Sequence, residues 1–286
     1  MKILGMGDNV VDRYINKRIM FPGGNAVNFA VYAGQCGEEA AYLGNIADDK
    51  EGILIRDSLK ALGIDVSMSP LKKGLATERC DVTLENGDRV FVGCEYGERG
   101  EDAWVPFSLK DEYTDYLRSF DLIHCGCYAS MEDEISKLTG INAVRTFDFS
   151  AEDEYRSDDY LRKVCPYIDI ALFSAAEMQP GQVEDIVEKA LGHGVRMVLV
   201  TDGTNGQKLW YGGKVYNGKV KKVEPVDTMG AGDSFFTAFV VSVMRAGFGD
   251  GKKLEESEIE EAFAYAADFS AKTCLSEGAF GFGTRY

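Results

Sequence analysis

Short apolar runs alternate with amphipathic helical stretches along almost the whole chain. The apolar runs have the length and composition of strands, and they cover residues 3–4, 42–46, 121–124, 146–149, 169–173 and 197–201. The helical stretches between them include residues 24–35, 50–62 and 183–191. This alternation predicts an α/β fold with a mostly parallel central sheet and helices on both of its faces. Ligands of such sheets bind beyond the carboxyl ends of the strands, so we expect the polar turns after these runs to gather at that edge.

Residues 71–100 interrupt this alternation. Two strand-like runs, at 77–84 and 89–92, flank an Asn-Gly pair that is typical of a tight hairpin turn. An antiparallel ribbon inserted in an α/β chain suggests a lid that closes over a ligand, and residues 10–19 could add a strand to it. We therefore expect a single domain over residues 1–286, with a small antiparallel β lid formed by about 10–19 and 71–100. An apolar ribbon face is often covered by a partner subunit, which leaves a homodimer through the lid open.

A glycine-rich loop precedes one of the predicted helices. Residues 227–233 have the sequence Asp-Thr-Met-Gly-Ala-Gly-Asp and run into an apolar helical stretch. The backbone N–H groups of Gly230, Ala231 and Gly232 would be unpaired at the helix start and, with the positive end of the helix dipole, form a site for an anion. Asp233 could then act as a base on an attacking hydroxyl, while the anion hole stabilises a phosphoryl group in transfer. The alternative is that Asp233 only caps the helix.

Composition limits the possible partners. The net charge of −16 argues against nucleic acid and anionic membrane surfaces. The N-terminus meets a charge too soon for a signal peptide, and no stretch approaches the ~18 apolar residues that cross a bilayer, so we expect a cytoplasmic protein. The seven cysteines include no Cys-x-x-Cys pair, and their odd number argues against a disulfide framework. With two histidines, His124 and His193, acid–base chemistry is expected to depend on a carboxylate.

Two segments resemble the signatures of the ribokinase/PfkB family of sugar kinases. Residues 227–235, Asp-Thr-Met-Gly-Ala-Gly-Asp-Ser-Phe, resemble its C-terminal signature, and residues 23–28, Gly-Gly-Asn-Ala-Val-Asn, resemble its N-terminal sugar-binding segment. The resemblance runs from about residue 5 to residue 279. Within the family it is greatest to the fructoselysine 6-kinases, through residues 7–12, 23–32, 88–91, 147–150 and 227–235. It implies a ribokinase-like fold and an ATP- and Mg²⁺-dependent transfer of the γ-phosphoryl group to a primary hydroxyl of a keto-sugar or its amino-acid adduct.

The resemblance also assigns roles in sugar binding and catalysis. It implies that Asp233 is the base that deprotonates the sugar hydroxyl, with the two glycines and the alanine before it as the anion hole. It further implies that Asp12, Gly24 and Asn28 hold sugar hydroxyls, a task that suits short carboxylate and amide side chains because each binds two neighbouring hydroxyls. Asp8 is a further candidate for substrate binding, or else it caps a turn.

A second set of residues is implied to bind the nucleotide. Residues 201–206, Thr-Asp-Gly-Thr-Asn-Gly, follow a predicted strand and resemble the family's nucleotide loop, although an ordinary turn between two strands would have the same composition. The implied ATP contacts are Thr201, Gly203, Gly206, Thr228, Gly230 and Gly232.

The expected metal site contains one departure from the family. Ser174-Ala-Ala-Glu177 stands where the family often has Asn-x-x-Glu. Glu177 is implied to place Mg²⁺ and its waters, or it is a plain helix-start carboxylate. The change from Asn to Ser is expected to alter metal affinity rather than abolish activity, since a serine hydroxyl can hold a metal-bound water. Asp227 and Thr228 resemble residues near a monovalent-cation site, which suggests K⁺ as a further ion.

The predicted lid supplies the candidates for acceptor specificity. Arg89 could reach a phosphate or the substrate's distal carboxylate, or it is simply solvated. Glu95 lies near Tyr96 and would suit a substrate with an amine in its tail. The alternatives that remain are a fructokinase, a ribokinase or a 2-keto-3-deoxygluconate kinase with the same chemistry, a nucleoside kinase, and a sugar-binding regulator that has lost the reaction.

Overall fold

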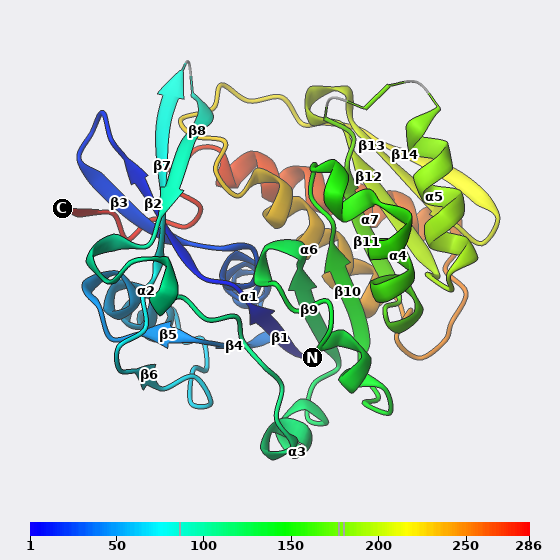
Figure 1. Cartoon of the computed structure of the whole chain (residues 1–286). Helices are drawn as coiled ribbons and strands as arrows, with labels where there is room; N and C mark the ends of the chain where they lie inside the picture. Colours follow the sequence, from blue (N-terminus) through cyan, green and yellow to red (C-terminus); the bar gives the residue numbers. More distant parts are fainter. Residues whose placement is uncertain (86, 177, 180) are drawn as a thin grey trace.

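The main body of the protein is built on a large sheet, shown in the computed structural model of Figure 1. The structure describes residues 1–85, 87–176, 178–179 and 181–286. Within these residues, eight strands form one sheet in the order β14-β13-β12-β11-β10-β9-β1-β4. The strands from β12 to β4 are parallel, whereas β13 and β14 are antiparallel to their neighbours. The prediction of an α/β fold with a mostly parallel sheet is confirmed.

The elements follow the alternation seen in the sequence. The strands of this sheet are β1 (Lys2–Gly7), β4 (Glu39–Gly44), β9 (Leu122–Gly126), β10 (Val144–Asp148), β11 (Ile170–Ser174), β12 (Met197–Thr201), β13 (Gln207–Tyr211) and β14 (Lys214–Gly218). The helices are α1 (Asn25–Gln35), α2 (Lys50–Ala61), α3 (Thr114–Leu117), α4 (Asp158–Val164), α5 (Gln182–Gly192), α6 (Ala231–Arg245) and α7 (Glu256–Thr273). In the part of the chain that the structure describes, no helix is both long and apolar enough to cross a membrane.

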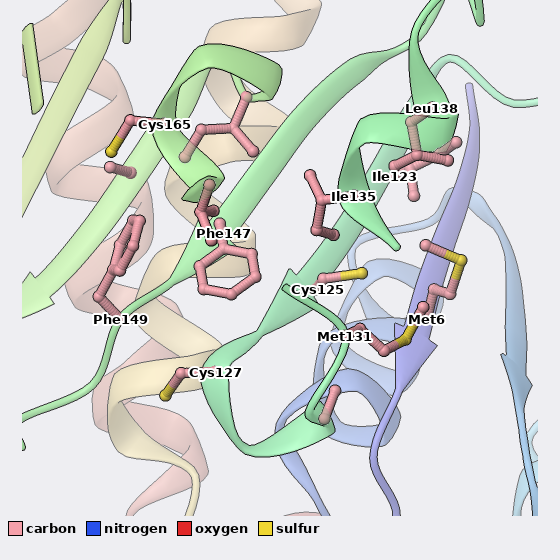
Figure 2. Close-up of a cluster of buried hydrophobic side chains, with 14 of the residues drawn as sticks. Met6, Ile123, Cys125, Cys127, Met131, Ile135, Leu138, Phe147, Phe149 and Cys165 are labelled. Atoms are coloured by element: carbon pink, nitrogen blue, oxygen red, sulfur yellow. The ribbon is translucent and has the colours of Figure 1, made fainter. Parts of the chain in front are cut away.

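Helices cover both faces of this sheet, and each face has its own apolar cluster. On one face, Phe29 of α1 and Phe239 of α6 pack with strand residues in a cluster that also includes α7. The opposite face packs against α4, α5 and short 3-10 turns. Figure 2 shows part of this second cluster, where Cys125 of β9 and Phe147 of β10 lie near Ile135. Because both faces are buried, the central strands are nearly continuous apolar runs, which is why they could be predicted from the sequence.

A second, smaller sheet projects from one end of the molecule (Figure 1). Its strands, in the order β15-β3-β2-β7-β8, are β15 (Thr284–Arg285), β3 (Ile19–Gly23), β2 (Val10–Tyr14), β7 (Glu78–Glu85) and β8 (Asp88–Glu95). We call it the lid sheet. β7 and β8 form the expected antiparallel hairpin, whose Asn86 lies outside the described residues, and β2 pairs with β7 in parallel.

The lid sheet differs from its expected limits at two places. It also contains β3 and β15, because the chain after β2 folds back and the C-terminal residues pair with β3. Residues 71–72 do not belong to it. They form β6 (Leu71–Lys72), which pairs with β5 (Ile46–Ala47) in a separate two-stranded sheet.

The cysteines differ in part from the prediction. Cys80 of β7 and Cys94 of β8 are joined by a disulfide, although the odd cysteine count argued against a disulfide framework. The pairing depends on the register of the hairpin, which places these two residues directly opposite each other and which the count cannot reveal. The other cysteines, including Cys125 and Cys127, are buried free thiols.

Candidate active site

The predicted anion site lies at the start of α6. Gly230 precedes the helix with a φ of 72°, and a Cβ on it would lie 2.2 Å from the hydroxyl oxygen of Tyr32. Glycine is therefore required there by the backbone conformation and by the close approach of the tyrosine. Gly232 has the opposite environment, since a Cβ on it would meet no described atom within 4 Å. The space above the helix start is thus open to a ligand.

The backbone amides at this helix start are partly free. Among the described residues, the N–H groups of Gly230 and Gly232 have no protein acceptor, and the helix dipole adds partial positive charge beside them. The N–H of Ala231 instead donates to the carbonyl oxygen of Thr228 at 3.1 Å. The prediction of three free amides is therefore wrong for Ala231, because the turn before the helix uses its N–H. The two glycine amides remain available, and their binding of an anion stays a prediction.

Asp233 lies in the first turn of α6 and is held by two asparagine side chains. The amide of Asn28 donates to its Oδ2 at 2.6 Å, and the amide of Asn25 donates to its Oδ1 at 3.0 Å. Burial raises the pKa of Asp233, while the bond from Asn28, the charge of Arg89 and the bond from Asn25 each lower it. The carboxylate is thus fixed in orientation, and its raised pKa makes it a better proton acceptor.

Asn25 links Asp233 to a buried histidine. Its Nδ2 donates to Asp233 and also to Asp148 Oδ2 at 2.9 Å, so its Oδ1 must accept from the Nε2 of His124, which is 2.8 Å away. His124 is fully buried, which lowers its pKa to about 3 and keeps it neutral. With the proton on Nε2, its Nδ1 accepts from the hydroxyl of Thr146 at 2.8 Å. A continuous hydrogen-bonded chain therefore runs from β10 through β9 to the carboxylate of Asp233.

Asp8 follows β1 and caps α1. Its carboxylate accepts from the backbone N–H of Asn25 at 2.6 Å and from that of Ala26 at 3.2 Å. This replaces the side-chain cap that Gly24, the residue before the helix, cannot provide. Burial raises the pKa of Asp8 to about 6 in spite of these bonds. Asp8 therefore caps the start of a helix rather than a turn, and its role in substrate binding stays a prediction.

Asp12 and Asn28 have unused polar atoms in the same part of the site. Asp12 of β2 is 4% exposed, yet among the described residues no hydrogen bond or ion pair reaches its side chain. Its burial raises its pKa to about 7, against the lowering effect of the charge of Arg89. The Oδ1 of Asn28 is also buried, and no atom of the described chain is its hydrogen-bond partner. A Cβ on Gly23 would lie 2.7 Å from Asp12 Oδ2 and 4.0 Å from Asn28 Oδ1, so the two oxygens flank a space that any side chain at Gly23 would fill.

The hairpin of the lid sheet contacts the loop before α6. Arg89 Nη1 donates to the carbonyl oxygen of Thr228 at 3.0 Å, and the hydroxyl of Thr228 donates to Asp88 Oδ1 at 2.8 Å. The backbone N–H of Thr228 donates to the carbonyl oxygen of Gly87 at 3.1 Å. The N–H, the carbonyl oxygen and the hydroxyl of Thr228 therefore all contact the hairpin in this conformation. Its side chain is not free for the ATP contact that the resemblance implied. Arg89 lies beside the site, near enough to Asp12 and Asp233 to lower the pKa of both.

Asp227 anchors the same loop. It is fully buried, and its carboxylate accepts from the hydroxyl of Tyr14 at 2.6 Å and from the backbone N–H groups of Met229 at 2.9 Å and Gly278 at 2.8 Å. Both of its oxygens therefore have protein donors. Tyr14 belongs to β2, so this contact ties the lid sheet to the start of α6.

The expected nucleotide loop follows β12, at the same edge of the main sheet. Gly203 and Gly206 have φ values of 47° and 108°, and the N–H of Asp202 closes the loop onto the carbonyl oxygen of Gly206 at 2.9 Å. Thr201 ends β12 and is half-buried. Ser174 ends the neighbouring β11, and its hydroxyl accepts from the N–H of Ala176 at 3.4 Å. Glu177, the expected metal residue, lies outside the described residues.

Sequence reasoning missed Asn25 and the residues connected to it, and it did not anticipate that Asn28 donates to Asp233. Asn25 lies inside the Gly-Gly-Asn segment that was singled out for sugar binding, and Asp148 lies in one of the polar turns expected at this edge. His124 carries no recognisable pattern. It is surrounded by apolar residues of β9, and its connection to Asn25 depends on the packing of α1 against the sheet.

Comparison with known proteins places the chain in a family. The model of the pfkB family of carbohydrate kinases matches residues 8–281. The fructosamine kinase FrlD of Bacillus subtilis (strain 168) is 33% identical over 289 residues, covering 100% of this chain and 95% of that protein. The fructoselysine 6-kinase of Escherichia coli (strain K12) is 31% identical over 281 residues, covering 98% of this chain and 100% of that protein.

Solved structures share the fold at lower identity. The ribokinase of Giardia lamblia superposes with a TM-score of 0.79 at 19% identity, covering 99% of this chain and 96% of that one. A fructokinase from Vibrio cholerae O395, solved with fructose, ADP and a calcium ion, superposes with a TM-score of 0.73 at 20% identity, covering 98% and 94%. The fold, the family match over nearly the whole chain and the two full-length relatives lead to one conclusion: this protein belongs to the pfkB family of carbohydrate kinases.

Proposed function

We propose that this kinase transfers the γ-phosphoryl group of ATP to a primary hydroxyl of a keto-sugar or its amino-acid adduct, and specifically to the 6-hydroxyl of fructoselysine. The observation that carries the proposal is the arrangement of Asp233. It lies beside two backbone amides at a helix start and beside oxygens of Asp12 and Asn28, all of which lack a partner within the described part of the chain. The names of two relatives that match over at least 95% of their length, a fructosamine kinase and a fructoselysine 6-kinase, support the acceptor.

The described residues support the following scheme for in-line transfer. Asp12 and Asn28 would bind sugar hydroxyls with their free oxygens and orient the acceptor hydroxyl toward Asp233. Asp233 would take the proton of that hydroxyl as the new O–P bond forms, while the bond between the γ-phosphorus and the β-phosphate oxygen breaks and ADP leaves. The N–H groups of Gly230 and Gly232 would stabilise the charge on the transferred group.

We further propose Mg²⁺ as the divalent ion that accompanies ATP. Ser174 fits a role in holding a metal-bound water, because its hydroxyl makes a single long hydrogen bond within the described chain. Glu177 lies outside the described residues, so its proposed role in placing the metal ion is supported by the family resemblance alone. We also propose a K⁺ ion near Asp227. Both carboxylate oxygens of Asp227 already accept hydrogen bonds from the protein, so this residue would act by fixing the loop beside the ion.

The lid sheet is proposed to close over the acceptor and to form a homodimer. β8 is an edge strand, and its Val90, Phe91 and Val92 are exposed by 42%, 53% and 60%. An exposed apolar edge of this kind is a template for pairing with another chain. Light scattering of the purified protein tests the dimer: a mass of two chains is expected, and a monomer at micromolar concentration would refute it.

The acceptor is tested by measuring ADP release with ATP and Mg²⁺ across fructoselysine, fructose, ribose, 2-keto-3-deoxygluconate and adenosine. A value of kcat/KM for fructoselysine far above the others is expected. Preference for another sugar would overturn the proposed acceptor while leaving the role of Asp233 intact. No release with any acceptor, together with measurable sugar binding, would refute the kinase and favour a regulator.

A further inference from the structure

Glu78 lies on the face of the lid sheet that is turned toward the proposed sugar site. In the register of β2 and β7, Glu78 stands beside Val10, and Cys80 stands beside Asp12. Residues two apart in a strand share a face, so Glu78 and Asp12 are on the same side of the sheet. A carboxylate oxygen of Glu78 and the sulfur atoms of Cys80 and Cys94 lie within 4.8 Å of one another, which confirms the direction of the glutamate side chain.

Glu78 is half-buried and has no partner among the described residues. No hydrogen bond or ion pair reaches its carboxylate, and its electrostatic neighbours include Asp8, Asp12 and Tyr96. Burial raises the pKa of Glu78, and the charge of Asp8 raises it further. A positively charged group placed beside this carboxylate would stabilise its ionised form. Asp12 on the same face is buried and also has no partner among the described residues, which is a second sign that this side of the sheet faces a ligand.

Glu95, the lid carboxylate that the sequence suggested for a substrate amine, is paired with arginine side chains. Glu95 pairs with Arg13 Nη1 at 2.6 Å and with Arg79 Nη1 at 3.7 Å. Arg13 and Arg79 alternate with Asp12 and Glu78 along their strands, so these ion pairs lie on the opposite face of the sheet. The earlier suggestion that Glu95 receives a substrate amine is therefore wrong for this conformation. Among the described residues, Glu78 is a lid carboxylate without a partner on the face that also carries Asp12.

We infer that Glu78 binds the ammonium group of a sugar–amine adduct and thereby selects such adducts over the free keto-sugar. This inference rests on the proposed function, because it names the group of the substrate that lies away from the phosphorylated hydroxyl. An aliphatic amine attached to the sugar is protonated near neutral pH. When the 6-hydroxyl of the adduct lies at Asp233, the carbon that bears the amine, at the other end of the sugar, points toward the lid sheet. There the ammonium group offsets the negative charge of Glu78 and its acidic neighbours.

The test compares three acceptors and three variants. The acceptors are fructoselysine, 1-amino-1-deoxyfructose, which keeps only the ammonium group, and fructose, which lacks it. Glu78→Gln removes the charge with little change of shape, Glu78→Asp keeps the charge on a shorter side chain, and Glu95→Gln is the matched control on the other face of the sheet. Thermal melting shows that each variant is folded.

Glu78→Gln is expected to lower kcat/KM for both ammonium-bearing acceptors roughly tenfold or more, mainly through KM, and to leave fructose nearly unchanged. Glu78→Asp should restore part of the loss, and Glu95→Gln should keep the wild-type preference. An equal loss for all three acceptors, or no loss for any, would overturn the role of Glu78. A wild-type enzyme that uses fructose but neither adduct would instead overturn the proposed acceptor, and the inference with it.

Discussion

Replacing Asn25 by alanine would remove three hydrogen bonds from the interior of the site, those to Asp233, Asp148 and His124. The change leaves the start of α1 intact, because Asp8 caps the helix through backbone N–H groups. It leaves the Nε2–H of the fully buried His124 without its acceptor, which costs about 1–3 kcal/mol. Asp233 also loses one of its two asparagine donors, although water entering the space offsets part of that loss.

The expected result is a loss of about 2–4 kcal/mol in the free energy of unfolding, measured by urea denaturation. Asn142→Ala is the matched control, because Asn142 is exposed at the amino end of β10, and it should change stability by less than about 0.5 kcal/mol. A second readout is the pH dependence of kcat/KM. The bond from Asn25 lowers the pKa of Asp233, so its removal raises that pKa and should move the acidic limb to higher pH. A stability loss below about 1 kcal/mol with an unmoved acidic limb would refute the hydrogen-bonded chain from His124 to Asp233.

Two other changes have defined outcomes. Asp12→Asn should stabilise the ligand-free protein at pH 8 but not at pH 4, because the folded-state pKa of Asp12 is raised to about 7 and its favourable contribution is lost as pH rises from about 4 toward that value. Melting temperatures of both proteins across this range check it, and a variant less stable than wild type at pH 8 would contradict it. Gly230→Ala should cost at least about 1 kcal/mol of stability and most of the activity, since a Cβ would lie 2.2 Å from the Tyr32 hydroxyl at a φ of 72°. Gly232→Ala is the control for stability, and a Gly230→Ala variant of wild-type stability would show that the loop can shift.

The parts of the fold that depend on local pattern were predictable from the sequence. The central strands are buried on both faces and stand out as apolar runs. Gly37, just after α1, has a left-handed φ of 90°, which is typical of glycine at the end of a helix. β3 and β15 were missed because their pairing is non-local. β15 has two residues, and only its contact with β3 makes it a strand. The Cys80–Cys94 pair was missed for the same reason, since it depends on the hairpin register.

The site could be predicted by residue type but not by hydrogen-bond partner. The glycine-rich loop before a helix indicated Asp233, and the family resemblance indicated Asp12 and Asn28. The structure brings the polar atoms of these three residues together. The sequence did not reveal that the N–H of Ala231 is used within the turn or that Thr228 contacts the hairpin. Both contacts depend on the exact path of one loop. The choice between Glu95 and Glu78 likewise depends on which face of the lid sheet each side chain occupies.

The most direct test of the account is the rate of phosphoryl transfer by Asp233→Asn, measured with ATP, Mg²⁺ and fructoselysine at saturating concentrations. Calorimetric titration with ATP and with the sugar would show that the variant still binds both. The account predicts a rate at least ~100-fold below wild type with binding retained, because the variant lacks the positioned base. A rate near that of wild type would contradict the assignment of Asp233 as the base.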